Sequence, residues 1–180
     1  TEALRPTLFV PMTGTAEQAR QIKPDPLAPA IANGGFEKQP LDTGFVPDWY
    51  YQRQTELVED ENAPEGQQYL AMSNSEPGLS AIAMQGFPID GRHVPRLQIS
   101  TRVKYESVRR GQSVEEMPAI VVTFYDKSRK ELGSRWIGPF RGTADWHQRR
   151  EVFRVPAAAR EAIIRIGLFG AVGKIGFDDI

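Results

Sequence analysis

The sequence predicts an all-β protein, an antiparallel β-sandwich made of two sheets. Short apolar runs follow one another from Leu27 onward, separated by turn residues at regular intervals, a pattern typical of sandwiches and barrels. Several runs alternate strictly between apolar and polar residues, as strands that cover a core on one side do. Glycine and proline, with 16 and 14 residues, are above their average share, which favours many turns and short elements.

The predicted strands, in chain order, are Asp48–Gln54, Gln68–Asn74, Leu79–Phe87, Arg96–Tyr105, Ala119–Asp126, Ser134–Ile137, Gln148–Val155, Ile163–Phe169 and Lys174–Ile180. Turn residues lie between them at Pro64–Gly66, Glu76–Gly78, Asp90–Gly91, Arg110–Gly111 and Arg141–Gly142. The segment Pro156–Ala162 has strong helix formers behind a proline. It is too short for a stable helix, so a single helical turn between two strands is expected.

Composition excludes several classes of function. A length of 180 residues suits one domain. The 22 basic and 23 acidic residues give a net charge of −1, which argues against a chain that coats nucleic acid or an anionic membrane. Cysteine is absent, so disulfides and thiolate metal sites are excluded. No run of about eighteen apolar residues occurs, so no membrane insertion is expected.

Residues 1–26 differ from the rest of the chain and are interpreted as an N-terminal arm or linker before a domain at 27–180. Pro24-Asp25-Pro26 interrupts any helix or strand that precedes it. The chain begins at Thr1 rather than Met, which is compatible with a removed signal peptide. It ends at Ile180 directly after an apolar, strand-like run, so we expect a domain that belongs to a longer protein.

The sequence lacks the usual catalytic constellations. Neither a Gly-x-Ser-x-Gly elbow nor a His-Glu-x-x-His motif is present. The adjacent carboxylates Glu115-Glu116 and Asp178-Asp179 make poor acid/base pairs, because neighbouring residues of a strand point to opposite faces. A non-catalytic domain is therefore expected.

Three motifs occur in order along the chain. The first is Asn33-Gly34-Gly35-Phe36-Glu37, followed by Pro47-Asp48-Trp49; the second is Asp145-Trp146, followed by Phe153-x-Val155-Pro156; the third is Phe177-Asp178-Asp179-Ile180. Asn-Gly-Gly tolerates positive φ and would let the chain turn sharply into Phe36, a core anchor. Trp146 is expected to pack in the core, and so is Trp49.

Together the three motifs resemble the calcium-binding jelly-roll carbohydrate-binding modules of the xylan- and glucan-binding type, which share a galactose-binding-domain-like fold. The resemblance runs from about Leu27 to Ile180. It implies a jelly-roll topology and a module that holds a polysaccharide or glycan for an attached or partner enzyme, such as a glycoside hydrolase. It also implies an extracellular or cell-surface location.

The resemblance further implies a structural calcium ion, held by the Glu of the first motif and an Asp of the last. The corresponding residues here are Glu37 and Asp178 or Asp179, with backbone carbonyls completing the oxygen shell that calcium prefers. The alternative is that these carboxylates cap turns or pair with Lys or Arg.

The alternation assigns the candidate ligand-binding residues. Outward positions that would stack on sugar rings or bond to hydroxyls are Arg102, Tyr125, Trp136 and Arg165. In the resembled modules such residues line the concave face. Two alternatives stay open: that Trp136 packs under a loop while the arginines pair with acids, and that the domain is a structural or protein-interaction sandwich without sugar binding.

Overall fold

The computed structural model describes residues 24–180, so most of the predicted arm at 1–26 lies outside the described residues. The described chain forms two antiparallel sheets of five strands and contains no helix. The strands are β1 (Tyr50–Arg53), β2 (Thr55–Glu59), β3 (Gln68–Asn74), β4 (Ile82–Pro88), β5 (Arg96–Arg109), β6 (Ala119–Tyr125), β7 (Glu131–Ile137), β8 (Gly142–Arg154), β9 (Glu161–Gly167) and β10 (Val172–Asp178).

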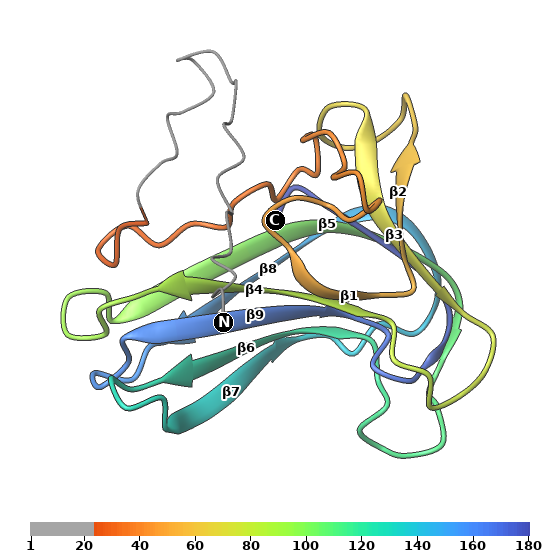
Figure 1. Cartoon of the computed structure of the whole chain (residues 1–180). Helices are drawn as coiled ribbons and strands as arrows, with labels where there is room; N and C mark the ends of the chain where they lie inside the picture. Colours follow the sequence, from red (N-terminus) through yellow and green to blue (C-terminus); the bar gives the residue numbers. More distant parts are fainter. Residues whose placement is uncertain (1–23) are drawn as a thin grey trace, which may run out of the picture.

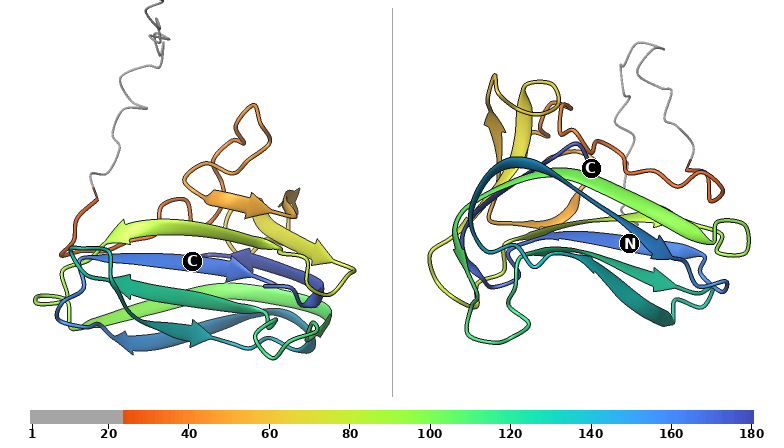
Figure 2. Two further views of the ribbon diagram at one scale, coloured as in Figure 1. Left: turned by 60° about the horizontal axis from the view of Figure 1, so that its bottom comes forward. Right: turned by 180° about the vertical axis from the view of Figure 1, so that it is seen from behind.

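The two sheets form the layers of a β-sandwich (Figure 1). Sheet A has the strand order β1-β4-β9-β6-β7, and sheet B has the order β2-β3-β10-β5-β8. Most connections between consecutive strands cross from one sheet to the other, as in a jelly roll. In Figure 1 the strands of sheet A lie in front of β5 and β8, and the view from behind in Figure 2 (right) brings β5 and β8 forward. The predicted fold class is confirmed.

The core lies between the sheets and follows the predicted alternation. Ile120, Val122 and Phe124 of β6 are fully buried, and they face buried side chains of sheet B such as Val103 and Phe177. Burying side chains of this size contributes roughly 1.5–3 kcal/mol each relative to exposure. The residues between them in each strand point away from the core, so both outer faces are defined by the same pattern.

Sequence reasoning missed β2, which follows β1 after one residue. Gln54 has a positive φ of 52°, so the run predicted as Asp48–Gln54 ends sharply and the chain passes from sheet A to sheet B. Two of the five residues of β2 are glutamates, both exposed, and none of the five is fully buried, so the sequence shows no apolar face. The predicted helical turn at Pro156–Ala162 is a short hydrogen-bonded turn, with the N–H of Ala159 donating to the carbonyl of Pro156 at 2.9 Å.

The first motif anchors the chain at Phe36 and turns it at Asn33, as predicted, but its two glycines act differently. Phe36 and Trp49 are buried, with ring centroids 5.5 Å apart. The residues with positive φ are Asn33 (51°) and Phe36 (58°), not the two glycines between them. The glycines instead leave room: a side chain on Gly34 would collide with the carbonyl of Ile180, and one on Gly35 with the carboxylate of Glu65.

Candidate functional site

The outer face of sheet A holds one row of side chains that crosses all five strands. Register pairs join Tyr50 to Met84, Met84 to Arg165, Arg165 to Val121, and Val121 to Trp136. Directly paired residues point to the same face, and in the three inner strands the neighbours of Met84, Arg165 and Val121 are buried. The row therefore lies on the outer face, with an aromatic residue at each edge.

The two edge aromatics are the exposed members of the row. Tyr50 is 65% exposed and Trp136 is 61% exposed, whereas Val121 is 7% exposed. Four strand intervals separate the edges, a span of about 19 Å at ~4.8 Å per interval. The face thus offers two aromatic rings at its edges and a polar group between them.

That central polar group is Arg165. Its Nη2 donates to Thr123 Oγ1 at 3.0 Å, and Thr123 Oγ1 lies 2.8 Å from Ser134 Oγ. Within residues 24–180 Arg165 has no ion-pair partner, so its remaining N–H groups are not committed to a carboxylate. Arginine presents five donors in a planar fork that suits hydroxyls and carboxylates.

The four predicted ligand-binding residues do not form one site. Trp136 and Arg165 share the row just described. Tyr125 is on the same face but four residues further along β6 than Val121, about 13 Å away, where it pairs with Glu131 and Glu161. Arg102 belongs to β5 in sheet B, where it pairs with Asp178 and Gln148. Its side chain is therefore on the opposite outer face, which contradicts the expectation of one shared face.

Sequence reasoning missed Tyr50 as a candidate. Trp49, Tyr50 and Tyr51 are consecutive aromatics, so alternation alone could not decide which one faces inward. The structure buries Trp49 to 3% exposure and leaves both tyrosines open. Trp49 Nε1 donates to the carbonyl of Asn33 at 3.1 Å, which fixes the choice. A hollow of about 690 Å³ adjoins Tyr50, with Leu41 and Phe45 also on its wall.

The residues predicted to hold calcium lie where three segments meet. The backbone N–H groups of Gln67 and Gln68 donate to Glu37 Oε1 at 3.0 and 2.8 Å. The N–H of Ile180 donates to the carbonyl of Gly34 at 3.2 Å. Figure 1 accordingly shows the C-terminus beside the segment that precedes β1. The first and last motifs are thus neighbours in space, as the resemblance implied.

Asp178 is the buried carboxylate of this junction. Its Oδ2 accepts a hydrogen bond from the N–H of Glu65 at 2.8 Å, and its Oδ1 accepts one from the N–H of Asp179 at 2.8 Å. Burial, together with the nearby charges of Glu65 and Asp179, raises its pKa to about 6 against the lowering effect of the two hydrogen bonds. The main cause is therefore the removal of this carboxylate from water, which disfavours its charged form.

The carboxylates are nevertheless not arranged as a finished metal site. Among residues 24–180 no group of three His, Cys, Asp or Glu side chains is placed to hold a metal ion. Glu37 is exposed, and its hydrogen bonds go to backbone groups. Calcium binding by Glu37, Asp178 and Asp179 stays a prediction.

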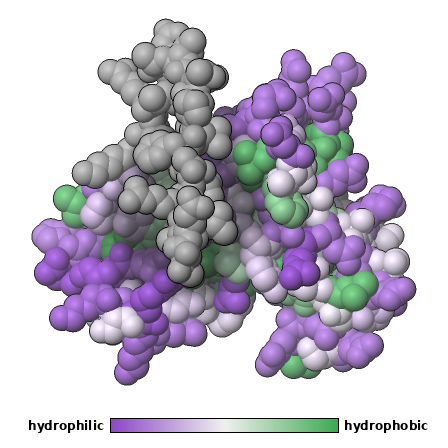
Figure 3. Space-filling model, viewed as in Figure 1, coloured by the Kyte–Doolittle hydropathy of each residue, from purple (hydrophilic) through white to green (hydrophobic). Residues whose placement is uncertain are grey.

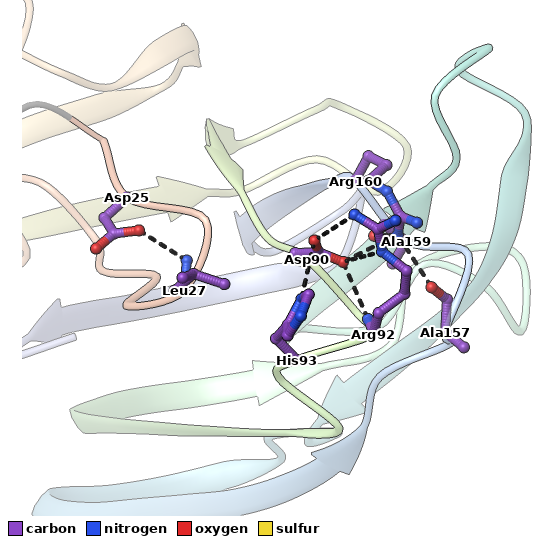
Figure 4. Close-up of polar contacts among 8 residues, drawn as sticks. All are labelled: Asp25, Leu27, Asp90, Arg92, His93, Ala157, Ala159 and Arg160. Carbon is purple, nitrogen blue, oxygen red and sulfur yellow. Dashed lines mark hydrogen bonds and ion pairs between the residues drawn. The ribbon is translucent and has the colours of Figure 1, made fainter.

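A second polar cluster surrounds Asp90 at the turn between β4 and β5 (Figure 4). Arg92 makes two side-chain bonds to it at 3.0 and 2.8 Å, His93 lies 3.2 Å away, and Arg160 lies 3.3 Å away. These contacts, those of Arg92 foremost, hold the pKa of Asp90 well below its usual range. Arg160 also donates to the carbonyl of Ala157 at 2.9 Å. The cluster links the turn between β4 and β5 to the turn between β8 and β9. Its donors and acceptors bond to one another.

The outer face of sheet B carries a groove of about 850 Å³ beside Tyr69 and Lys104. Trp146, which we expected in the core, lies on this outer face. Its ring meets that of Tyr69 edge to face, with centroids 5.2 Å apart, and the Nζ of Lys104 lies over both rings. Gly176 lies beneath Tyr69, so the Tyr69 ring covers a strand position that has no side chain of its own.

Outside the grey atoms, the face drawn in Figure 3 is mostly hydrophilic, with separate small hydrophobic patches. Within residues 24–180 there is also no helix of the length and apolarity needed to cross a membrane.

No family model matches the sequence, and no curated protein matches it. Solved structures share the fold. A Family 16 Carbohydrate Binding Module-2 has a TM-score of 0.54 at 18% identity, covering 83% of this chain and 96% of that one. A CBM4 structure has a TM-score of 0.52 at 18% identity, covering 83% and 96%. The enzymatically active domain of the Bacteriophage CBA120 tailspike protein 4 has a TM-score of 0.53 at 15% identity, covering 82% of this chain and 20% of that one.

The fold is therefore that of a β-sandwich seen in carbohydrate-binding modules. The carbohydrate-binding modules match along nearly their whole length, whereas the tailspike contains this fold as one part of a larger chain.

Proposed function

We propose that this protein is a non-catalytic carbohydrate-binding module whose site is the outer face of sheet A. The observation that supports this most is the cross-strand row that begins at Tyr50, ends at Trp136 and has Arg165 at its centre. The similarity in fold to carbohydrate-binding modules supports the same class of ligand.

The row suits a sugar chain that crosses the strands. Tyr50 and Trp136 present aromatic faces on which the C–H surfaces of sugar rings stack. Arg165, whose guanidinium is held by Thr123, would then bond to sugar hydroxyls or to a uronic carboxylate between the two rings. Tyr125, further along the same face, would contact a branch or a second chain.

The test is affinity electrophoresis in gels that contain xylan, β-glucan or pectin. The double variant Tyr50→Ala, Trp136→Ala should bind roughly tenfold to a hundredfold more weakly than the wild type, since each stacking contact contributes about 0.5–1.5 kcal/mol. Val114→Ala removes an apolar side chain that is 73% exposed in the loop between β5 and β6, and should bind as the wild type does.

Two results would count against the proposal. Equal retardation of the wild type and the double variant would place the site elsewhere. No retardation of the wild type, together with a negative glycan array, would favour the rival class, a structural or protein-interaction sandwich of a larger exported or surface protein.

The proposal also includes a structural calcium ion, an enzyme that the module serves, and a location outside the cell or at its surface. Glu37, Asp178 and Asp179 would hold a structural calcium ion, which would supply the positive charge that the buried Asp178 lacks. The module would serve an attached or partner enzyme outside the cell or at its surface, where polysaccharides occur. The tailspike supports an attached enzyme, because there a similar fold forms part of a longer, enzymatically active chain.

A further inference from the structure

A stripe of arginines lies on the outer face of sheet B, away from the row on sheet A. Arg96 and Arg102 come from β5, and Arg150 and Arg154 come from β8. Arg96 pairs directly with Arg154, Ser100 pairs with Arg150, and Arg102 pairs with Gln148. The residues between them in β5, such as Leu97, Ile99 and Val103, are buried in the core, so all four arginines are on the outer face.

Arg102 has a carboxylate opposite it, that of the buried Asp178 in β10, whereas none of the other three arginines has an acid as its direct cross-strand partner in the described sheets. None of the four arginines takes part in an ion pair within residues 24–180. Arg96, Arg150 and Arg154 are exposed and Arg102 is half-buried. The one acid nearby in β8, Glu151, pairs with the inward-facing Ile99 and so belongs to the other face. Arg149, the neighbour of Arg150, likewise faces the other way, with its guanidinium 5.7 Å from the ring of Phe140.

The pairing of Arg96 with Arg154 works against stability. Like charges directly opposite one another in an antiparallel pair are destabilising, and the chain as a whole has almost no net charge. An anion that lies between the two strands would remove this repulsion. The stability of the fold therefore does not explain the stripe of arginines, whereas binding of an anion does.

We propose that this stripe binds an anionic polysaccharide along β5 and β8. From Arg96 to Arg102 the stripe extends about 20 Å along the strand, and the two strands are ~4.8 Å apart, which matches an extended polyanion rather than a compact one. Gln98, Ser100 and Gln148 lie between the arginines on this face and offer amide and hydroxyl groups to sugar hydroxyls. None of the outward positions from Arg96 to Arg102 is aromatic, and the rings of Tyr69 and Trp146 on the same face lie beyond Arg102 with the Nζ of Lys104 over them. Along the stripe itself single-stranded nucleic acid would find no ring for base stacking.

The choice of ligand class rests on the proposed function, but the site does not, because it uses the opposite sheet. The probe is polygalacturonate, with fully methyl-esterified pectin as the uncharged counterpart, both in chelator. The triple variant Arg96→Gln, Arg150→Gln, Arg154→Gln should bind polygalacturonate about tenfold more weakly. Its binding to xylan or β-glucan should not change. Raising the salt concentration should weaken wild-type binding, since exposed charges are screened.

The charge-matched control is Arg109→Gln, Arg110→Gln, Arg141→Gln, which removes three exposed arginines at the other end of the same strand pair. It should bind polygalacturonate as the wild type does. Arg96→Gln alone should melt no lower than the wild type, because it relieves the repulsion from Arg154.

The proposal fails if wild type and triple variant bind polygalacturonate equally, if the control loses as much as the triple variant, or if methyl-esterified pectin binds as well as the charged form. Tighter binding of the wild type to a DNA duplex or to phosphatidylserine vesicles than to polygalacturonate would also overturn it. The double variant at Tyr50 and Trp136 should still bind polygalacturonate through the stripe, which separates failure of this proposal from failure of the site on sheet A.

Discussion

Asp178 in the last strand accepts a hydrogen bond from the backbone N–H of Glu65, which lies 113 positions earlier in the chain, at 2.8 Å. The bond joins β10 to the loop between β2 and β3. It does so with a carboxylate whose pKa is raised to about 6, chiefly by burial.

This raised pKa predicts a specific pH dependence for the metal-free protein. Between the ordinary Asp pKa of 3.8 and about 6, the folded state binds a proton that the unfolded chain has lost, so the folded state loses stability as pH rises through this window. The free energy of unfolding in chelator should fall from pH 4 to pH 6 by more in the wild type than in Asp178→Asn. Denaturant titrations across this range measure the difference, and parallel curves for the two proteins would contradict the assignment.

Calcium should reverse this behaviour. A metal that binds only the folded state stabilises it by about 2.7 kcal/mol at a hundredfold excess over Kd, and it requires the deprotonated carboxylate. Chelator should therefore lower the Tm at pH 7, and Glu37→Ala should abolish that response. Elemental analysis must accompany the melt, because a firmly retained ion would mask the effect. An unchanged melting curve and no bound ion would refute calcium binding.

The two tryptophans Trp49 and Trp136 should separate stability from binding. Trp49 is 3% exposed and packs on Phe36, so Trp49→Ala should cost about 3–5 kcal/mol in the free energy of unfolding. Trp136 is 61% exposed, so Trp136→Ala should change that free energy little and act on sugar binding. Denaturant unfolding and affinity electrophoresis on the same proteins give both readings. A large loss of stability in Trp136→Ala would mean that the ring packs under a loop.

Among the buried side-chain amides, Gln85 should be the one whose replacement lowers the free energy of unfolding most. Its Oε1 accepts from the N–H of Ala32 at 2.7 Å, and its Nε2 donates to the carbonyls of Ala32 and Asp48 at 2.9 and 3.0 Å. Gln85→Leu would leave these backbone groups without partners at a cost of about 2–4 kcal/mol. Gln98→Leu, on an exposed position of β5, is the control. Similar midpoints in denaturant for both variants would show that the amide contributes little.

Tyr125 should matter only for branched ligands or for a second chain. It lies about 13 Å along the strands from the row that contains Trp136, so a linear oligosaccharide that follows that row does not reach it. Tyr125→Ala should leave affinity for linear oligosaccharides unchanged and lower affinity for branched ones. Calorimetric titrations with linear and branched oligosaccharides of equal length test this, and an equal loss for both would place Tyr125 inside the main site.

Much of the fold could be predicted because the alternation of apolar and polar residues is strict where a strand covers the core. Strand β3 begins and ends at the predicted residues. Strand β2 was missed because Glu56 and Glu59 give it no apolar face, and because a single residue, Gln54, turns the chain between sheets.

The candidate site could be predicted only in part. Alternation places a side chain on the outer face of its own strand, but it does not say to which sheet the strand belongs. Arg102 and Arg165 therefore looked equivalent in sequence and lie on opposite sides of the sandwich. Tyr50 was hidden because three consecutive aromatics compete for one inward position, and the hydrogen bond from Trp49 to Asn33 that decides between them is not visible in sequence.

The order of the strands constrains how this domain can be made in the cell. Strand β9 lies between β4 and β6, and β10 lies between β3 and β5, so the last two strands to leave a ribosome are inner members of both sheets. Until they emerge, β3, β4, β5 and β6 have open edges on the side that will receive them, and open strand edges invite pairing with other chains. The domain is therefore expected to fold only after its synthesis has reached the third motif, and chaperones that shield strand edges should affect its yield more than those that assist helix docking.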